Sequence, residues 1–176
     1  GSMPEYFEAT AEAAQQWDVA MRSAVMTARY AECMKVEKSA ALCAQSSPMY
    51  FGQQDHNDDA LALAREVDDC RYGRAYANED CRALAQRLGR ERGYDPAVIH
   101  LAQQPEMVVL CHSPVEVSDP AVCGAAGTLV RRGDLRFHQV NVFEAPQVPS
   151  PWGIYTDAHD PLSGETIAAS INVWAF

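Results

Sequence analysis

The N-terminal part of the chain carries the hydrophobic spacing of helices. From Glu8 to Lys35 apolar side chains recur at helical spacing with no Pro or Gly, which predicts one long amphipathic helix. Its apolar positions are Trp17, Met21, Ala24, Val25 and Ala28. Shorter helices are predicted over residues 39–44, 58–67 and 78–88. Another should follow Asp95-Pro96, where an N-cap residue precedes a proline suited to the first helical position.

From Pro105 onward the pattern changes to short β-branched and apolar runs separated by Pro, Gly, Asp and Ser. These runs predict strands over residues 107–111, 135–143 and 166–176. The last run alternates as a strand with one buried face does, with Ile167, Ala169, Ile171 and Val173 on one side and Ala168, Ser170 and Asn172 on the other. The predicted fold class is therefore α+β, with a helical N-terminal half followed by a small sheet.

Three parts of the chain follow from this pattern. Residues 1–3, Gly-Ser-Met, read as a cloning remnant, residues 4–104 form a helical region, and residues 105–176 form a β-rich segment. A chain of 176 residues with 48% hydrophobic residues has the size and apolar content of one domain. We therefore expect the two regions to form one compact unit.

The charge balance excludes two classes of partner. The chain holds 24 acidic and 14 basic residues, a formal net charge of -10, which repels nucleic acid and anionic membrane surfaces. No apolar run approaches the roughly 18 residues that span a bilayer. We expect no nucleic-acid partner and no membrane span.

Six cysteines, none in a CxxC pair, favour disulfides over a zinc site. In sequence order they form three local pairs, Cys33 with Cys43, Cys70 with Cys81, and Cys111 with Cys123. Six cysteines allow about 15 pairings, and six buried free thiols in a cytosolic protein are the alternative. The local pairing favours a disulfide-stabilised protein that is secreted or periplasmic.

An acidic run gives one candidate metal site. Asp55, Asn57, Asp59 and Glu66 stand at positions one, three, five and twelve of a calcium-binding loop. Ala60, however, occupies the sixth position, where the sharp turn of such a loop needs Gly. The interpretation we favour is an acidic cluster at the N-terminus of a helix.

The sequence holds no motif for catalysis. The five histidines never form HxxxH or HExxH, and GxSxG, SxxK and P-loop patterns are missing. His159 alone has carboxylate neighbours, Asp157 and Asp160, in a predicted loop. A solvated turn residue is the interpretation we favour for it. No catalytic residue and no metal ligand is assigned, and the chain should be inactive by itself.

Several sequence blocks nevertheless share the order and spacing of a known family. The blocks are Cys111–Val115, Asp119–Gly124, Gly133–Phe137, Ser150–Gly153, Asp160–Ile167 and Ala169–Asn172. Over about residues 106–176 the chain resembles the region upstream of the HExxH helix in large secreted bacterial zinc-dependent metallopeptidases of the zincin type. The helical half resembles no family.

The resemblance implies a fold and a role. It implies a mainly antiparallel sheet like the upper part of a zincin catalytic domain, in which an edge strand pairs with extended substrate. The matching strand covers residues 166–173, with the cleft-edge residues Ala168, Ala169, Ser170, Ile171 and Asn172, and residues 160–165 form the turn before it. The Cys111–Cys123 disulfide is implied as well. Zinc is implied for a complete parent enzyme and no cofactor for this chain, which stops at Phe176 before any HExxH helix.

Three functions follow as hypotheses. The first is the non-catalytic upstream fragment of a secreted zinc metallopeptidase, whose partner is an extended polypeptide substrate or a missing C-terminal catalytic part. The second is a stand-alone, disulfide-stabilised module that binds a protein or peptide. The third is a degenerate, inactive peptidase domain.

Overall fold

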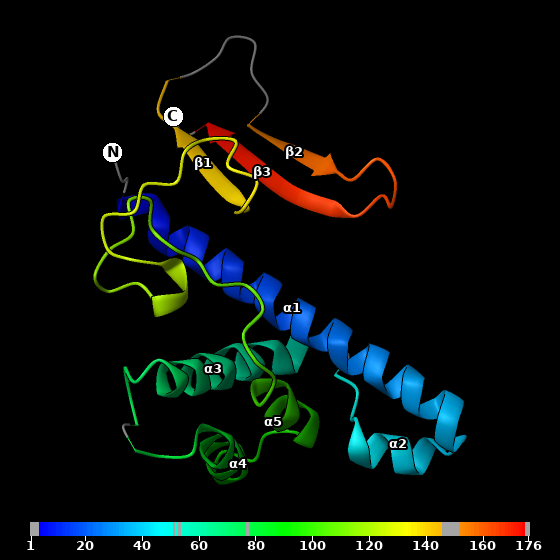
Figure 1. The fold of residues 1–176 in the computed structure, drawn as a ribbon. Helices are drawn as coiled ribbons and strands as arrows, with labels where there is room; N and C mark the ends of the chain where they lie inside the picture. The colour runs from blue at the N-terminus through cyan, green and yellow to red at the C-terminus, as the bar shows by residue number, and fades with distance from the viewer. Residues whose placement is uncertain (1–3, 51, 53, 77, 146–151, 175–176) are drawn as a thin grey trace. The chain divides into compact units, whose positions relative to one another are not determined.

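The structure is a computed structural model that describes all residues except 1–3, 51, 53, 77, 146–151 and 175–176 (Figure 1). Of residues 4 and 54–56 it describes only the backbone. The predicted cloning remnant, residues 1–3, lies outside the described residues. The chain forms two compact units, one of residues Ala9–Leu110 and one that joins Gly1–Glu8 to Cys111–Phe176. We call these the helical unit and the β unit.

Among the described residues, five helices account for the N-terminal half, as predicted. They are α1 (Pro4–Glu37), α2 (Ala40–Ser46), α3 (Gln54–Arg71), α4 (Cys81–Glu91) and α5 (Pro96–Ala102). Three begin at the capping residues that local sequence favours. Ser39 accepts from the Leu42 N–H, Asp80 from the Arg82 and Ala83 N–H groups, and Asp95 from the Ala97 N–H.

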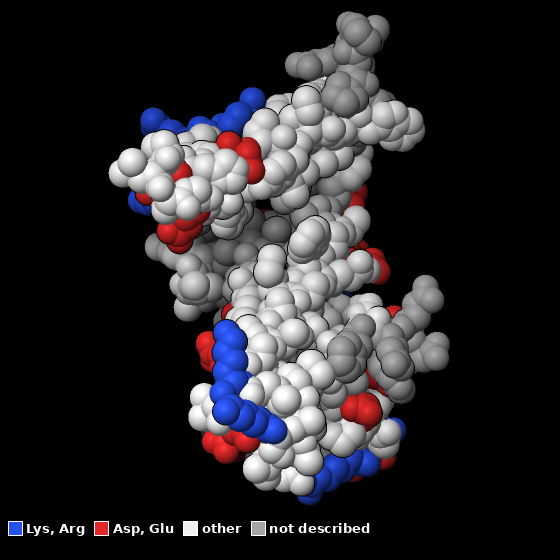
Figure 2. Space-filling view, turned by 90° about the vertical axis from the view of Figure 1, so that its right-hand side faces the viewer, with Lys and Arg blue, Asp and Glu red and all other residues white. Residues whose placement is uncertain are grey.

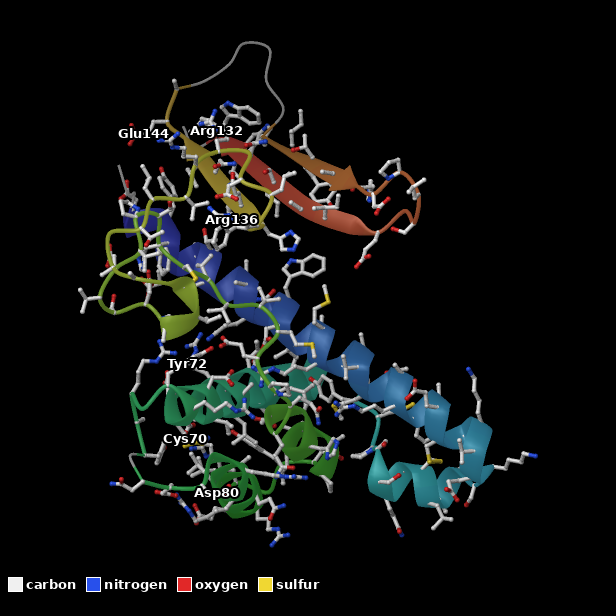
Figure 3. The ribbon with its side chains drawn as sticks, in the orientation of Figure 1. Cys70, Tyr72, Asp80, Arg132, Arg136 and Glu144 are labelled. Carbon is white, nitrogen blue, oxygen red and sulfur yellow. A yellow bond between two sulfur atoms is a disulfide. The ribbon has the colours of Figure 1, made fainter. Side chains whose placement is uncertain are left out.

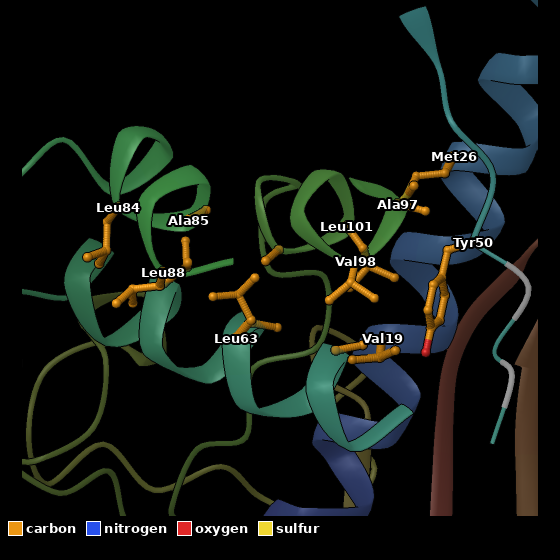
Figure 4. Packing of buried hydrophobic residues seen from close by; sticks show 14 of the residues in the cluster. Val19, Met26, Tyr50, Leu63, Leu84, Ala85, Leu88, Ala97, Val98 and Leu101 are labelled. Carbon is orange, nitrogen blue, oxygen red and sulfur yellow. The ribbon is translucent and has the colours of Figure 1, made fainter. Parts of the chain in front are cut away.

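The core of the helical unit forms where α3 meets α4 and α5. Leu63 of α3 is fully buried, and Leu84, Val98 and Leu101 are almost fully enclosed in the same cluster (Figure 4). Gly89 lets α4 and α5 approach closely, because a Cβ atom there would stand 2.4 Å from Cγ1 of Ile99. The missing side chain is therefore a packing requirement at this position.

The buried face of α1 differs from the prediction. Trp17 is 62% exposed and Met21 is exposed too, whereas Asp18, Val19 and Arg22 are buried. The helix forms as expected, but a neighbouring face turns inward. The ion pairs of Arg22 with Asp18, four residues before it, and with the distant Asp68 make this burial of charge possible.

The segment predicted as a first strand, residues 107–111, is irregular. The Asp18 carboxylate accepts the backbone N–H groups of Met107 and Val108 at 2.6 and 3.1 Å, which ties this segment to α1. The boundary between the units consequently follows Leu110 and not residue 104, and the expectation of one compact unit is replaced by two.

The β unit contains a short 3-10 helix, Ala121–Cys123, and three strands. The strands are β1 (Gln139–Phe143), β2 (Gly153–His159) and β3 (Thr166–Trp174), in the spatial order β1-β3-β2. β3 is parallel to β1 and antiparallel to β2. The α+β class is confirmed, and the sheet is mixed, with a longer antiparallel ladder between β2 and β3 and a shorter parallel ladder between β1 and β3. The sequence pattern missed β2, and the last two residues predicted for β3 lie outside the described residues.

The predicted turn between β2 and β3 is present. The Asp160 N–H donates to the Glu165 oxygen at 2.8 Å, and the Gly164 N–H donates to the Asp160 oxygen at 2.8 Å. Gly164 has a φ of 74°, which glycine adopts without strain. The Asp160 side chain also accepts the N–H groups of Leu162 and Ser163.

All three predicted disulfides are present. Cys33 bonds Cys43, Cys70 bonds Cys81 and Cys111 bonds Cys123, with Cα atoms 5.7 Å apart in each pair. The alternative of six free thiols is therefore wrong for this structure. Each disulfide closes a local loop and restrains the unfolded chain.

Candidate functional site

The strand predicted to form the cleft edge lies in the centre of the sheet. Within β3, Ser170 pairs with Gln139 of β1 on one side and with Thr156 of β2 on the other. Of the predicted residues, Ala168 and Ala169 pair with β2 alone, whereas Ser170, Ile171 and Asn172 are paired on both sides and therefore cannot receive an added strand. The prediction of their edge position is wrong, because strand β2, which the pattern did not reveal, covers one side of β3.

The side-chain alternation of β3 is correct, but its two faces have the opposite burial. Ala168 is buried, while Ile167, Ile171 and Val173 are exposed. On the other face, side chains of β3 contact their directly paired neighbours on β1. The Asn141 amide donates to Asn172 at 3.0 Å, and the Phe143 and Trp174 rings stack with centroids 5.6 Å apart.

Among the described residues no strand pairs with the other side of β2, which is therefore an open edge. The Trp174 N–H donates to the Trp152 oxygen at 3.1 Å, which makes Gly153 and Val173 a pair without hydrogen bonds between them. Such pairs alternate with hydrogen-bonded pairs along an antiparallel ladder. The N–H and C=O groups of Gly153, Tyr155 and Asp157 therefore point away from β3, toward the open side.

The residues of β2 do not block its edge against a further strand. Its sequence, GIYTDAH, contains no Pro or Lys, and its register shift lies at the far end, between Ala158 and His159. Along β1 the situation differs. The Gln139 amide donates to the Arg131 oxygen at 2.8 Å, and the Arg132 guanidinium lies 4.6 Å from the Phe143 ring centroid (Figure 3). β2 is thus the edge more accessible to a partner strand.

The face beside this edge is apolar and exposed. Val140, Ile171 and Tyr155 form one row across the three strands, and their exposed fractions are 43%, 42% and 59%. Directly paired residues project to the same face. The next row contains Val142, Val173 and Gly153. An added strand would therefore extend an apolar surface.

Polar side chains lie at the far end of β2. An Asp157 oxygen lies 2.8 Å from Nε2 of His159, and Nδ1 of His159 lies 3.3 Å from the Thr166 hydroxyl. Burial raises the pKa of Tyr155, and the charge and hydrogen bonding of Asp157 raise it further. His159 is the last residue of β2, so the interpretation as a loop residue is wrong. These groups provide a carboxylate beside the open edge.

A second histidine–carboxylate pair serves the disulfide loop. Nδ1 of His112 lies 2.7 Å from Asp119, which also accepts the N–H groups of His112 and Glu116. The Phe7 ring stacks on His112 with centroids 3.5 Å apart. Burial alone would raise the Asp119 pKa, but these hydrogen bonds outweigh it and the pKa lies below its ordinary value. The pair holds the loop that the Cys111–Cys123 disulfide closes.

The helical unit contains a buried charge network. Arg22 is fully buried and lies 2.6 Å from Asp18 and 2.5 Å from Asp68. Glu106, which accepts from the Tyr72 hydroxyl, lines a neighbouring cavity of about 10 Å³ with Asp18 and Asp68. This volume accommodates one water molecule at most. The network therefore ties elements together and offers no space for a ligand.

Burial has the largest effect on the pKa of two acids in this network. It raises the pKa of Asp68 in spite of the nearby Arg22 and Arg71 guanidinium groups. It also raises the pKa of Glu106, and the hydrogen bond from Tyr72 opposes this only in part. Both acids therefore hold a proton more tightly in the folded chain than in the unfolded chain.

The calcium-binding loop that we considered and did not favour for the acidic run does not form. α3 begins at Gln54, so Asn57, Asp59 and Glu66 lie on a helix and cannot wrap around an ion. Glu66 accepts two hydrogen bonds from Arg92, at 2.6 and 3.0 Å. The side chain of Asp55 lies outside the described residues. The interpretation as an acidic cluster near the start of a helix agrees with α3.

The described residues do not fit a zinc site. No group of three or more His, Cys, Asp or Glu side chains among them is arranged to hold a metal ion. The six cysteines are bonded in pairs and supply no thiolate. None of the helices in the described part of the chain combines the length and apolar character that crossing a bilayer requires.

Charged side chains form small separate groups on the face shown in Figure 2.

Comparison with protein-family models, curated proteins and solved structures finds no match for this chain. The open edge of β2 and the apolar face beside it are therefore the features from which a function can be argued.

Proposed function

We propose that this chain is a disulfide-stabilised module that binds extended polypeptide segments by adding them as a strand to β2. The observation that carries this proposal is the outward direction of the backbone groups of Gly153, Tyr155 and Asp157. A row of unpaired N–H and C=O groups is the template that strand addition uses.

The scaffold supports such binding because the edge is already ordered. β2 pairs with β3 over Gly153–His159, and β3 is held from its other side by β1. A partner that adds to a preformed strand loses its own conformational freedom but orders little of the receptor. The apolar row of Val140, Ile171 and Tyr155 supplies surface for its side chains.

The same proposal includes an oxidising compartment as the site of action. Three disulfides within 176 residues are typical of secreted, extracellular or periplasmic proteins. Extended polypeptides in such compartments are the partner class that we infer.

Amide hydrogen exchange with and without a library of extended, proline-free peptides tests the proposal. Binding should slow exchange of the Tyr155 and Asp157 amides, which point outward. The Ile154 and Thr156 amides, which face β3, serve as internal controls and should change little. Failure of all peptides to bind, or protection confined to the helical unit, would contradict strand addition at β2.

The sequence blocks over residues 106–176 favour a second candidate, the upstream part of a secreted zinc metallopeptidase. In this case the open edge of β2 would take the substrate-pairing role that the resemblance assigned to residues 166–173. The native reading frame beyond Phe176 tests this candidate. An HExxH motif within a few dozen codons supports it, whereas a related segment without this motif supports an inactive peptidase-like scaffold. A stop codon directly after Phe176 contradicts both.

A further inference from the structure

The geometry of β2 limits which polypeptide fits its edge, an inference that rests on the proposed function. The outward backbone groups belong to Gly153, Tyr155 and Asp157. A partner strand must therefore place alternate residues directly opposite these three. Because directly paired residues project to the same face, these three partner side chains meet the apolar face that contains Ile171 and Val173.

Opposite Gly153 the partner finds room for a large side chain. Gly153 has no Cβ, and a Cβ added there would lie 3.3 Å from the Asn172 backbone oxygen, closer than most such contacts. Its neighbour in the row, Val173, is exposed. An aromatic side chain from the partner can extend across the glycine and cover Val173, as aromatic residues do beside glycines in sheets.

Opposite Tyr155 the partner meets the exposed apolar row. Tyr155 is 59% exposed and stands beside Ile171. Cross-strand pairs of an aromatic with a β-branched residue stabilise sheets relative to alanine pairs. A Val, Ile or Thr at this position of the partner therefore fits the row.

Opposite Asp157 the partner meets a carboxylate. The Asp157 side chain retains partial exposure, and its hydrogen-bonded neighbour His159 lies farther along the strand. Opposite charges at directly paired positions stabilise a sheet, and like charges destabilise it. The net charge of -10 also attracts a basic segment.

We propose that the partner is an extended segment that carries, from its N-terminus, a basic, a β-branched and an aromatic residue at alternate positions. The order follows from antiparallel pairing, in which the residue opposite Asp157 precedes the residue opposite Gly153. Antiparallel pairing is also the slightly more stable arrangement per residue.

Synthetic peptides with the core Lys-Ser-Val-Ser-Phe, labelled for fluorescence anisotropy, test this inference on the full chain. The peptide should bind more tightly than the reversed core Phe-Ser-Val-Ser-Lys. N-methylation of the valine, whose N–H faces Tyr155, should weaken binding by about tenfold, the equivalent of one hydrogen bond. N-methylation of the serine after the valine is the matched control, because its N–H points away from β2, and it should change the affinity little.

A charge exchange tests the position opposite Asp157. Asp157→Lys should lose the preference for the lysine peptide and prefer a peptide with Glu in its place. The thermal unfolding midpoint of this surface variant, compared with the parent, verifies that it is folded. Equal binding of both peptides by parent and variant would overturn the assignment of this position.

Different results would overturn strand addition at β2 and the sequence preference of the partner. If no peptide of the wider library binds, strand addition itself is wrong. If library peptides bind and protect the Tyr155 amide without preference among the cores, only the sequence preference is wrong. Tighter binding of the reversed core would overturn the antiparallel orientation.

Discussion

The Arg22 guanidinium, fully buried in the helical unit, donates to the Asp68 carboxylate at 2.5 Å across 46 positions of sequence. It also lies 2.6 Å from Asp18 and donates to the Gln104 oxygen at 3.0 Å. These contacts join α1 to α3 and to the end of α5. The buried Arg22 cation and its acceptors thus hold α1 against the rest of the helical unit, a role that an apolar stripe has in most helices of this kind.

Replacing Arg22 should strongly destabilise the helical unit. Arg22→Ala removes the cation between the buried carboxylates of Asp18 and Asp68 and leaves Asp68 with Arg71 alone, so we expect a loss of about 3–5 kcal/mol of unfolding free energy. Urea denaturation followed by far-UV circular dichroism measures the loss. Arg87→Ala is the matched control, because it breaks the exposed pair of Arg87 with Glu79 and should change stability by less than about 1 kcal/mol. Similar losses in both variants would contradict a structural role of the buried pair.

Glu106 should make the helical unit less stable as pH rises. Burial raises its pKa in the folded chain, so the folded state binds the proton more tightly than the unfolded state. Its contribution to stability is therefore fully present below the ordinary glutamate pKa and is lost as pH rises through the folded value. Glu106→Gln keeps an acceptor for the Tyr72 hydroxyl and removes the charge.

The Glu106→Gln variant should accordingly have a higher unfolding midpoint than the parent near pH 7, with the difference vanishing near pH 4. Thermal unfolding across this pH range measures both. Asp68 titrates in the same direction and remains in the variant, so part of the pH dependence should persist. Glu91→Gln, at an exposed side chain, is the control and should show no such gain. A Glu106→Gln variant less stable than the parent at pH 7 would contradict the raised pKa.

A side chain at Gly89 should destabilise the helical unit while Ile99 is present. A Cβ at Gly89 would stand 2.4 Å from Cγ1 and 2.7 Å from Cδ1 of Ile99, so Gly89→Ala should cost about 1–3 kcal/mol in spite of the better helix propensity of alanine. In the background of Ile99→Ala, which removes both atoms, the same change should cost much less. A double-mutant cycle in urea measures the coupling, and additive effects would show that α4 and α5 do not meet at this point.

Loss of the Cys70–Cys81 disulfide should destabilise the chain by about 2–4 kcal/mol, since the bond closes a loop with a sequence separation of 11. The double variant Cys70→Ser, Cys81→Ser, compared with the parent in denaturant without reductant, measures this. Reduction of the parent should reproduce or exceed the loss, because it opens all three bonds. An unchanged midpoint in the double variant would contradict a stabilising role of this bond.

Local chemistry was sufficient for the helices and disulfides. Ser39, Asp80 and Asp95 cap the helices that their positions predict, because an N-cap side chain acts on backbone groups two or three residues away. The disulfides also join cysteines that are neighbours in sequence order. Interactions between residues this close in sequence can be predicted without knowledge of the tertiary fold.

The candidate site depended on pairing that sequence does not display. β2 was missed because GIYTDAH lacks a regular apolar alternation and lies between turn-forming residues. Its pairing with β3 places β3 in the centre of the sheet and Ser170, Ile171 and Asn172 between two strands, not at the expected edge. Edge and centre positions depend on which distant strands pair, a non-local choice that a single strand pattern does not contain.

The amino-acid sequence by itself determined the α+β order, the presence of the helices, the local disulfides and the alternation of β3, since each depends on neighbours within a few turns of chain. Only the tertiary structure decided which faces are buried. On α1 the ion pairs of Arg22 with Asp18 and Asp68 turned charged residues inward and left Trp17 outside. On β3, Asn172 and Trp174 contact paired neighbours on β1, while Ile171 on the opposite face is exposed. Burial is a property of the partners that meet a surface, and these partners are brought together by folding.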